Sequence, residues 1–308
     1  MNAGPVLGPA GVEALRDAPL AWALLIGGGV VFVALMVLLL LALSPKDRPL
    51  RPRWWLVGGG LVFPAVVLAA LQAFNLRHID RLPDPVSTDV LVVALSGRLW
   101  WWELRYVDYP ASGRPVVTAN ELRLPVGRPV RLGLQSDEVI HSLWIPALAG
   151  KVDLVPGRVA QLQLQVDRAG VWRAPCAEFC GEPHARMVLH AVAQAPAEFD
   201  AWLANQARPA REPASAIEAR GRDAFVSLRC VSCHTVRGVG SAVVPGPDLT
   251  HVASRLYIGA GTLPNDPASL RAWIAAVQAH KPGARMPSFD TLDPPTLDAL
   301  AAYLAGLR

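Results

Sequence analysis

The run Cys176-Ala-Glu-Phe-Cys180-Gly-Glu-Pro-His184-Ala-Arg-Met187 decides how the middle of this chain folds. It holds two thiols, an imidazole and a thioether, which are the ligand types that copper selects. Glycine and proline residues within and before the run favour a loop over a helix, so the side chains are able to surround a metal. One further histidine is needed, and His141 in Val-Ile-His-Ser-Leu-Trp is the candidate.

Two cysteines in this loop predict more than one metal ion. A mononuclear blue-copper site needs a single Cys, so Cys176 and Cys180 together indicate two copper ions bridged by thiolates. The alternative is a disulfide, or a pair of thiols buried on one helix face, which is common in exported domains. That alternative gives no reason for a His and a Met at fixed offsets.

The residues around the loop have the pattern of a β domain. Between residues 89 and 194, short segments alternate apolar and polar residues, as in residues 161–166, and are separated by Gly and Pro. Such alternation is typical of half-buried strands in an antiparallel β-barrel or sandwich. We assign this domain to residues 83–205.

Two apolar stretches precede the β domain. Residues 20–43 and 54–76 are each long enough to cross a bilayer core, which takes about 20 helical residues. A cleavable signal peptide is the alternative for the first stretch, but such peptides have apolar cores of roughly 7 to 15 residues and a small-residue cleavage site. We expect a two-helix transmembrane hairpin over residues 18–82, after an N-terminal periplasmic segment of residues 1–17.

The connection between the two apolar stretches indicates their orientation. It carries Lys46, Arg48, Arg51 and Arg53 against one acid, Asp47. Basic loops stay in the cytoplasm, so this loop should face inward. The N-terminus and all residues after the hairpin are then expected on the periplasmic face of the inner membrane.

The last third of the chain changes to a helical pattern. Residues 206–216 have the proline-rich, polar composition of a semi-rigid linker. Beyond it, Asp266-Pro267 and Asp293-Pro294 each place a capping acid before a proline at the first helical position. We expect a small all-α domain over residues 217–308.

The segment Cys230-Val-Ser-Cys233-His234 has the pattern for covalent attachment of haem c. Its two thiols form thioethers with the haem, and the adjacent His binds the iron. A thioredoxin-like site is the alternative, but it expects a βαβ context. The sixth ligand is expected to be Met286. The remaining histidines are interpreted as surface or capping residues instead of ligands: His78, His190, His251 and His280.

Composition and charge narrow the function further. The chain is 52% hydrophobic with a net charge of +4, and its Lys and Arg are dispersed. Because no basic run is interleaved with aromatic residues, we expect no nucleic acid partner. The four cysteines form the two local pairs described above, and none is left over.

The copper loop resembles that of subunit II of haem-copper cytochrome c oxidases, which has the pattern His, then Cys-x-Glu-x-Cys-x-x-x-His-x-x-Met. The resemblance covers roughly residues 18 to 205 and implies a cupredoxin-like β-barrel with a dinuclear CuA centre. It implies that Trp100, in Trp100-Trp101-Trp102, is the point where electrons enter, while packing remains an equal reading for Trp101. It also implies a Mg²⁺ ion held by the Glu178 side chain at the boundary with subunit I. The implied copper ligands are His141, Cys176, the Glu178 carbonyl, Cys180, His184 and Met187.

Residues 217–308 resemble class I cytochrome c domains, and the whole chain resembles the caa-type arrangement. That resemblance implies an oxidoreductase and translocase subunit that takes electrons from an external donor, such as cytochrome c or a quinol-cytochrome c reductase. Its implied partners are membrane lipid, oxidase subunit I and subunit III. Oxygen reduction to water, coupled to proton translocation, would occur in subunit I.

Three other functions are weighed against this one. A nitrous oxide reductase also uses CuA, but it needs a large propeller domain for which the chain has no room. A copper-delivery or thiol protein would gain nothing from a haem. A quinol oxidase subunit II keeps the barrel but lacks the copper ligands that are intact here.

Overall fold

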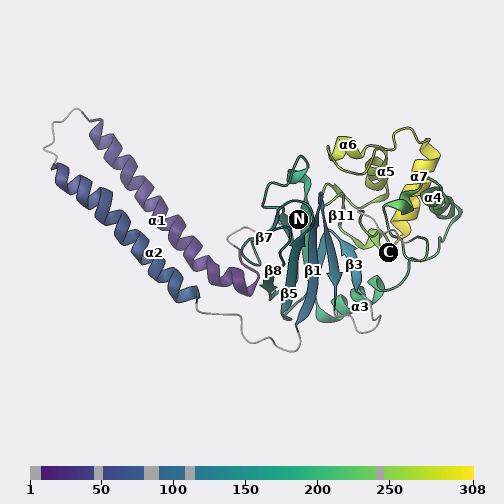
Figure 1. The fold of residues 1–308 in the computed structure, drawn as a ribbon, viewed down its shortest axis with the longest axis horizontal. Coiled ribbons are helices and arrows are strands. Elements are labelled where there is room, and N and C mark those ends of the chain that lie inside the picture. Colours follow the sequence, from purple (N-terminus) through teal and green to yellow (C-terminus); the bar gives the residue numbers. More distant parts are fainter. Residues whose placement is uncertain (1–7, 45–50, 80–89, 108–114, 241–245) are drawn as a thin grey trace. The chain divides into compact units, whose positions relative to one another are not determined.

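The computed structural model describes residues 8–44, 51–79, 90–107, 115–240 and 246–308. The chain divides into two compact units: one spans residues 20–88, and the other combines residues 1–19 with residues 89–308 (Figure 1). Lys46, Asp47 and Arg48 of the expected cytoplasmic loop lie outside the described residues, and so does the expected domain boundary at residue 83.

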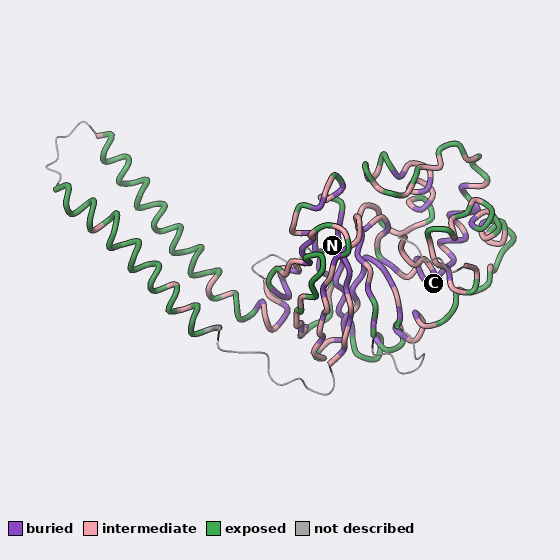
Figure 2. The backbone as a smooth tube through the Cα atoms, viewed as in Figure 1, coloured by how far each residue is buried: buried purple, intermediate pink, exposed green. Residues whose placement is uncertain are grey.

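The N-terminal helices are α1 (Val12–Ala42) and a second helix that begins as the π-helical segment η1 (Trp54–Val62) and continues as α2 (Phe63–Ile79). Both are long and apolar enough to cross a membrane. At 1.5 Å per residue, α1 is about 46 Å long, more than a bilayer core of about 30 Å. Figure 2 shows both helices exposed along most of their length. Because a helix that is apolar on all faces needs an apolar surrounding, this exposure fits membrane helices. The expected pair of apolar helices is confirmed.

The start of α1 belongs to the same compact unit as the β domain. The backbone N–H groups of Ala10 and Gly11 both donate to the carbonyl of Ala147, at 2.7 and 3.1 Å. Gly11 also forms an isolated β-bridge with Val166. The residues just before α1 therefore lie against the β domain.

The described residues of the β domain form ten strands. The larger sheet has the order β3-β2-β1-β5-β8, the second has the order β4-β10-β9, and β6 pairs with β7. The strands are β1 (Leu91–Arg98), β2 (Trp101–Tyr106), β3 (Val116–Ala119), β4 (Glu121–Pro125), β5 (Val130–Ser136), β6 (His141–Leu143), β7 (Val152–Leu154), β8 (Ala160–Leu164), β9 (Gly170–Pro175) and β10 (Val188–Gln194).

The alternation led us to expect only antiparallel pairings, but two strand pairs are parallel. β1 pairs with β5 in parallel, with Leu91 opposite Val130, and β10 pairs with β4 in parallel. Parallel neighbours need a long crossover, and here the chain crosses between the two sheets before it returns. Local alternation indicates strands but not the direction of partners far away in the chain, so the antiparallel expectation was wrong for these two pairs.

The core of the β domain lies between the two sheets. Inward-facing residues of the larger sheet, such as Val93, Leu95 and Leu134, share one buried cluster with Leu122 and Leu189 of the second sheet. At one end, α3 (Pro196–Gln206) inserts Phe199 and Leu203 into the same cluster. This core fixes the strand ends on which the copper loop is built.

The C-terminal domain is helical. Its elements are α4 (Ala216–Ser227), η3 (Cys230–Ser232), η4 (Val252–Ser254), β11 (Tyr257–Ile258), β12 (Leu263–Pro264), α5 (Pro267–Ala275), α6 (Val277–His280) and α7 (Pro294–Gly306). Asp266 and Asp293 cap α5 and α7 as expected, accepting from Ser269 N at 2.8 Å and Thr296 N at 3.3 Å. α4 and α7 cross closely at Gly221, where a Cβ would collide with the Ala299 carbonyl.

The connection between the two domains, for which the composition predicts a semi-rigid linker, is hydrogen-bonded to the C-terminal domain. Arg211 Nε donates to the Gly306 carbonyl at 2.5 Å, and Ala210 N donates to the Arg237 carbonyl at 2.9 Å. Arg237 also donates to the Gln206 carbonyl. The segment that leads into α4 is therefore held on the C-terminal domain.

Candidate metal centres

The copper loop joins β9 to β10 and is closed at its base by backbone hydrogen bonds. Cys176 N donates to the Met187 carbonyl at 2.8 Å, so the two ends of the loop meet. Ala177 N donates to the Ser142 carbonyl at 3.0 Å, which fixes the loop against β6. His141 lies at the start of β6, so the same contact brings this distant histidine to the two thiols.

The structure brings together five of the expected copper-binding side chains. Their sulfur and nitrogen atoms lie 3.6 to 3.9 Å apart in a chain of neighbours: His141 Nδ1 to Cys176 Sγ 3.8 Å, Cys176 Sγ to Cys180 Sγ 3.9 Å, Cys180 Sγ to His184 Nδ1 3.6 Å, and Cys180 Sγ to Met187 Sδ 3.9 Å. The Glu178 carbonyl lies 3.3 Å from Cys176 Sγ. His141 and Met187 are fully buried, and both thiols are nearly so.

These atoms fit a metal better than they fit a disulfide. Both cysteines are free thiols. Their sulfurs are separated by 3.9 Å, nearly twice the roughly 2.05 Å of a disulfide bond. That spacing lets one ion bind both sulfurs at about 2.3 Å, the usual metal–thiolate length for zinc. The buried Nε2 of His141 has no hydrogen-bond partner in the part of the chain that the structure describes.

The two thiols compete for one proton when no metal is bound. The hydrogen bond from Cys180, with a smaller contribution from His141, lowers the pKa of the Cys176 thiol to about 3 although burial acts in the opposite direction. That same hydrogen bond, together with burial, raises the pKa of Cys180. A buried pair of thiolates needs added positive charge, which metal ions supply.

Gly97 supports the candidate copper site, although no sequence pattern marks this residue. A Cβ at this position would lie 2.6 Å from Cδ2 of His141, so the imidazole packs directly on the β1 backbone. The His141 ring also lies 5.9 Å from the ring of Trp102, the partner of Gly97 across β1 and β2. The imidazole therefore packs against two neighbouring strands before any metal binds.

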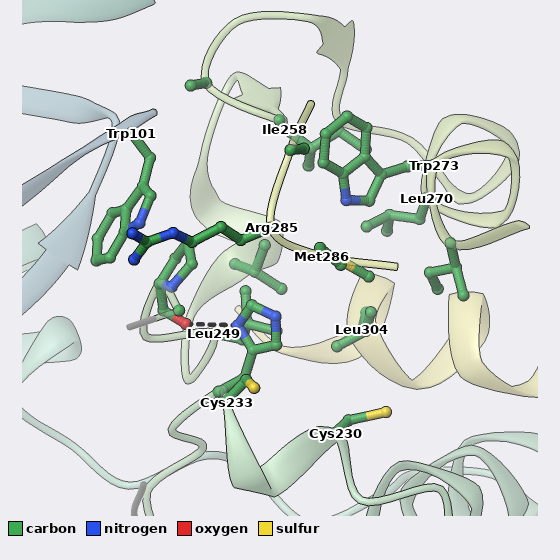
Figure 3. Close-up of a pocket in the computed structure, with 18 of the residues that line it drawn as sticks. Trp101, Cys230, Cys233, Leu249, Ile258, Leu270, Trp273, Arg285, Met286 and Leu304 are labelled. Carbon is green, nitrogen blue, oxygen red and sulfur yellow. Dashed lines mark hydrogen bonds between the residues drawn. The ribbon is translucent and has the colours of Figure 1, made fainter. Parts of the chain in front are cut away.

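The haem motif opens on a cavity of about 520 Å³ in the C-terminal domain. Cys230, Cys233, His234 and Met286 all line it, and Figure 3 shows Met286 reaching the cavity from a different segment than the two cysteines. The volume lies within the range of about 300–1,000 Å³ that is typical of cofactor sites. Most of the remaining lining is apolar, which suits a porphyrin.

His234 is oriented as a ligand. Its Nδ1 lies 2.9 Å from the Pro247 carbonyl, which leaves Nε2 for a metal. Burial lowers the pKa of His234, so the imidazole is neutral. Gly246 lets the chain lie close to this ring. A Cβ at this position would collide with the Cys233 carbonyl and would lie 3.0 Å from Cε1 of His234.

Gln278 fastens the loop that carries Met286, and the sequence did not suggest this role. Its Nε2 donates to the carbonyls of Ala284 and Met286 at 2.7 and 2.9 Å. Its Oε1 accepts from Gly283 N at 3.0 Å. One side chain therefore fixes both ends of the turn before Met286.

Trp100 contacts both sites. Its indole Nε1 donates to the Cys180 carbonyl at 2.6 Å, and Trp100 is also one of the residues that line the haem cavity. Lys281 of the C-terminal domain donates to the Trp100 carbonyl at 2.7 Å. Trp101 lines the same cavity and is buried in a small cluster with Ala260, so it packs where the two domains meet. We call this contact, between Trp100 and Trp101 of the β domain and Ala260 and Lys281 of the C-terminal domain, the seam.

The Glu178 carboxylate lies away from these contacts, and so do His190 and His251, which are buried and not on the surface as expected. Glu178 has its carboxylate 3.3 Å from the Lys151 ammonium, in a partly exposed ion pair. His251 lies 2.8 Å from the Arg308 carbonyl and 3.0 Å from the Arg208 carbonyl, outside the cavity. His190 stacks on Tyr257 with ring centroids 4.2 Å apart.

Comparison with known proteins gives a family for each domain. Residues 91–194 match the model of the cytochrome c oxidase subunit II periplasmic domain, and residues 218–308 match the cytochrome c model. These matches imply copper for the first domain and haem c for the second.

Individual proteins agree with the family models. Cytochrome c oxidase subunit 2 of Alkalihalophilus pseudofirmus is 36% identical over 230 residues, which are 74% of this chain and 65% of that protein. The same subunit from Bacillus sp. (strain PS3) is 27% identical over 266 residues, or 83% of this chain and 73% of the relative. The crystal structure of the periplasmic domain of subunit II of cytochrome oxidase from Bradyrhizobium japonicum is 25% identical, with a TM-score of 0.36, over 40% of this chain and 95% of that one.

Proposed function

The chain belongs to the subunit II family of cytochrome c oxidases, in a form that carries its own cytochrome c domain, and we propose that it conducts electrons from an external donor to the catalytic subunit. In this proposal the donor reduces the cytochrome c domain, the Trp100 turn conducts the electron to the copper domain, and subunit I receives it. The donor is a cytochrome c or a quinol-cytochrome c reductase.

The proposal assigns each metal centre to side chains of this chain. Haem c would be held by thioethers to Cys230 and Cys233 and by His234 and Met286. The dinuclear copper centre would be held by His141, Cys176, the Glu178 carbonyl, Cys180, His184 and Met187. When bound, these groups supply reversible one-electron oxidation and reduction. The protein holds the ligands in place and keeps water away from them.

One observation carries the proposed route. Trp100 lines the haem cavity, and its indole donates a hydrogen bond of 2.6 Å to the carbonyl of Cys180. A single residue therefore contacts the copper loop and also lines the haem cavity. An electron that leaves the cytochrome c domain here does not need to cross solvent.

The membrane helices give the proposal its place in the cell. Ala10, just before α1, is hydrogen-bonded to the β domain at Ala147. The two ends of a transmembrane hairpin lie on one side of the membrane, which fits the periplasmic location of this family's β domain. Oxygen reduction and proton translocation would take place in subunit I, with subunit III as a further partner.

We also propose that Glu178 contributes to a Mg²⁺ site where the β domain meets subunit I. Its carboxylate is partly exposed and is paired with Lys151 in the isolated chain. A carboxylate oxygen suits Mg²⁺, which would compete with the ammonium for it. In the assembled oxidase, Glu178→Gln should lower bound Mg²⁺ without changing the copper content, and equal Mg²⁺ in both proteins would contradict this assignment.

Spectroscopy of the purified protein tests the main proposal. A haem c absorption band and a mixed-valence, seven-line copper EPR signal are expected, and rapid reduction of the haem should be followed by reduction of copper. A four-line mononuclear signal would contradict the copper pair. Reduction of copper at a rate independent of haem reduction would contradict the route.

A further inference from the structure

We propose that Lys281 is a positioning residue that fastens the cytochrome c domain to the turn at Trp100. This inference rests on the proposed function, because it concerns the passage of electrons between the two domains. Lys281 is one of only three lysines in the chain and directly precedes the Pro-Gly of the loop that carries Met286. It therefore connects the haem ligand loop to the copper domain.

The Lys281 ammonium is inserted into the seam between the domains. The residue is only 4% exposed. Its Nζ donates to the Trp100 carbonyl at 2.7 Å and to the Gly259 carbonyl of its own domain at 3.1 Å. One cation thus joins a backbone group on each side of the seam.

Trp100 carries the connection onward to the copper loop. Its indole donates to the Cys180 carbonyl at 2.6 Å. The copper loop also packs on this ring, because a Cβ at Gly181 would lie 3.0 Å from Cζ2 of Trp100. A continuous series of hydrogen bonds therefore runs from Gly259 through Lys281 and Trp100 to Cys180.

A buried ammonium is a costly way to fill space. Burial lowers the pKa of Lys281 to about 7, and the nearby charges of Cys180 and Arg186 act on it in opposite directions. A methionine or leucine would pack in such a seam without this desolvation cost. The two carbonyl acceptors explain the lysine: without it, the Trp100 carbonyl would lose this donor, and the Gly259 carbonyl would keep the hydrogen bond from Thr262 Oγ1 at 2.7 Å.

Other contacts hold the seam without help from Lys281, so its loss should loosen the seam but not separate the domains. Val188 N donates to the Ala260 carbonyl at 3.0 Å, and Leu256 N donates to Glu121 Oε2 at 2.8 Å. Both amides report on the closed seam by hydrogen exchange. They require no bound metal for the measurement.

Three variants of the full protein, with haem c and copper bound, test the role of Lys281. Lys281→Met removes the charge and keeps the length, Lys281→Arg keeps a donor cation, and Arg271→Met removes an exposed cation from the same domain, away from the seam. Loss of a buried hydrogen bond from a charged group changes an equilibrium constant by about tenfold. We therefore expect electron transfer from haem to copper to slow roughly tenfold in Lys281→Met. Reduction of the haem by an external donor and the copper EPR signal should not change.

Lys281→Arg should keep at least half of the wild-type transfer rate, and Arg271→Met should keep all of it. In Lys281→Met, the amides of Val188 and Leu256 should exchange faster, while those of β1 stay protected. If Lys281→Met does not attach haem, Lys281→Gln, which has no charge, is measured in its place.

The role of Lys281 would be overturned if the uncharged variant transferred electrons from haem to copper as fast as the wild type and its seam amides exchanged at the wild-type rate. That result would leave the proposed function intact. Absence of haem-to-copper transfer in the wild-type protein would instead overturn the proposed function.

Discussion

The copper loop and the haem cavity differ in how their ligand residues are arranged. In the copper loop the ligand atoms already touch one another, with Cys176 Sγ 3.9 Å from Cys180 Sγ and His141 fully buried beside them. In the C-terminal domain the ligand residues stand around a cavity of about 520 Å³. A metal ion fits between side chains that the β scaffold has placed, whereas a haem must fill the centre of its domain.

This difference follows from the size of each core. The β domain buries a large cluster drawn from two sheets and α3, and its strands satisfy their own backbone hydrogen bonds. The C-terminal domain has fewer than one hundred residues and a smaller cluster arranged around the cavity. Small domains gain little from burial alone, so the haem should contribute much of the apolar contact that stabilises this one.

The largest effect should come from preventing haem attachment. In Cys230→Ala/Cys233→Ala the cavity stays empty, and we expect α4, α5 and α7 to lose protection from hydrogen exchange and to become sensitive to protease. The copper EPR signal and the protection of β1 and β5 should persist. A C-terminal domain that stays protected without haem would remove the contrast between the two regions.

Loss of copper should affect less of the molecule. Cys180→Ser removes one thiolate of the proposed copper pair, so the seven-line EPR signal should disappear, while haem attachment and the folding of both domains persist. The thermal midpoint of the β domain should fall by only a few degrees, since about 1 kcal/mol shifts the midpoint of a domain of this size by roughly 4 °C. Unfolding of the β domain would mean that the metal, and not the scaffold, orders the loop.

The sequence predicted those features that depend on nearby residues. The copper loop holds four ligand side chains within a short run, and a local pattern of Gly and Pro marks it as a loop. The starts of α5 and α7 follow from Asp266 and Asp293, whose carboxylates cap their own helices. In each case the partners are only a few residues apart, so spacing alone identifies them.

Features that depend on distant partners could not be predicted in this way. Lys281 and Trp100 are 181 residues apart, and no periodicity links them. Gly97 matters because His141 packs on it, and the parallel pairing of β1 with β5 depends on the path of the chain between sheets. Local pattern determines an element, while tertiary contact determines its neighbour.

Two glycine substitutions should affect one site each. In Gly97→Ala the new methyl group would lie 2.6 Å from the His141 ring, so copper affinity should fall with haem unchanged. In Gly246→Ala the methyl group would collide with the Cys233 carbonyl, so haem attachment should fall with copper unchanged. Overpacking of this kind costs about 1–3 kcal/mol in unfolding free energy.

Gly150→Ala is the matched control for both glycines, since nothing lies within 4 Å of the added atom. Copper and haem content, measured by metal analysis and absorbance in the same sample, give the result. If either substitution lowered both contents equally, the two sites would not be independent.

The last expected effect concerns pH and the seam between the regions. His190 is 7% exposed and stacks on Tyr257 of the C-terminal domain. Burial, with a further contribution from Arg173, lowers the pKa of His190 to about 4. Below the unfolded pKa of about 6.5, the unfolded chain therefore binds a proton that the folded protein excludes, and stability falls as the pH drops from 6.5 toward 4.

Between pH 7 and pH 5 this residue should lower the unfolding free energy by about 1–2 kcal/mol, with some of the effect screened by solvent. Denaturant unfolding of the wild-type protein and of His190→Gln at both pH values isolates this contribution, because glutamine does not titrate. The variant should lose less stability on acidification than the wild type. Equal losses of unfolding free energy would mean that His190 is protonated as easily in the seam as in the unfolded chain. The packing of the two regions around His190 would then be too loose to exclude a charge.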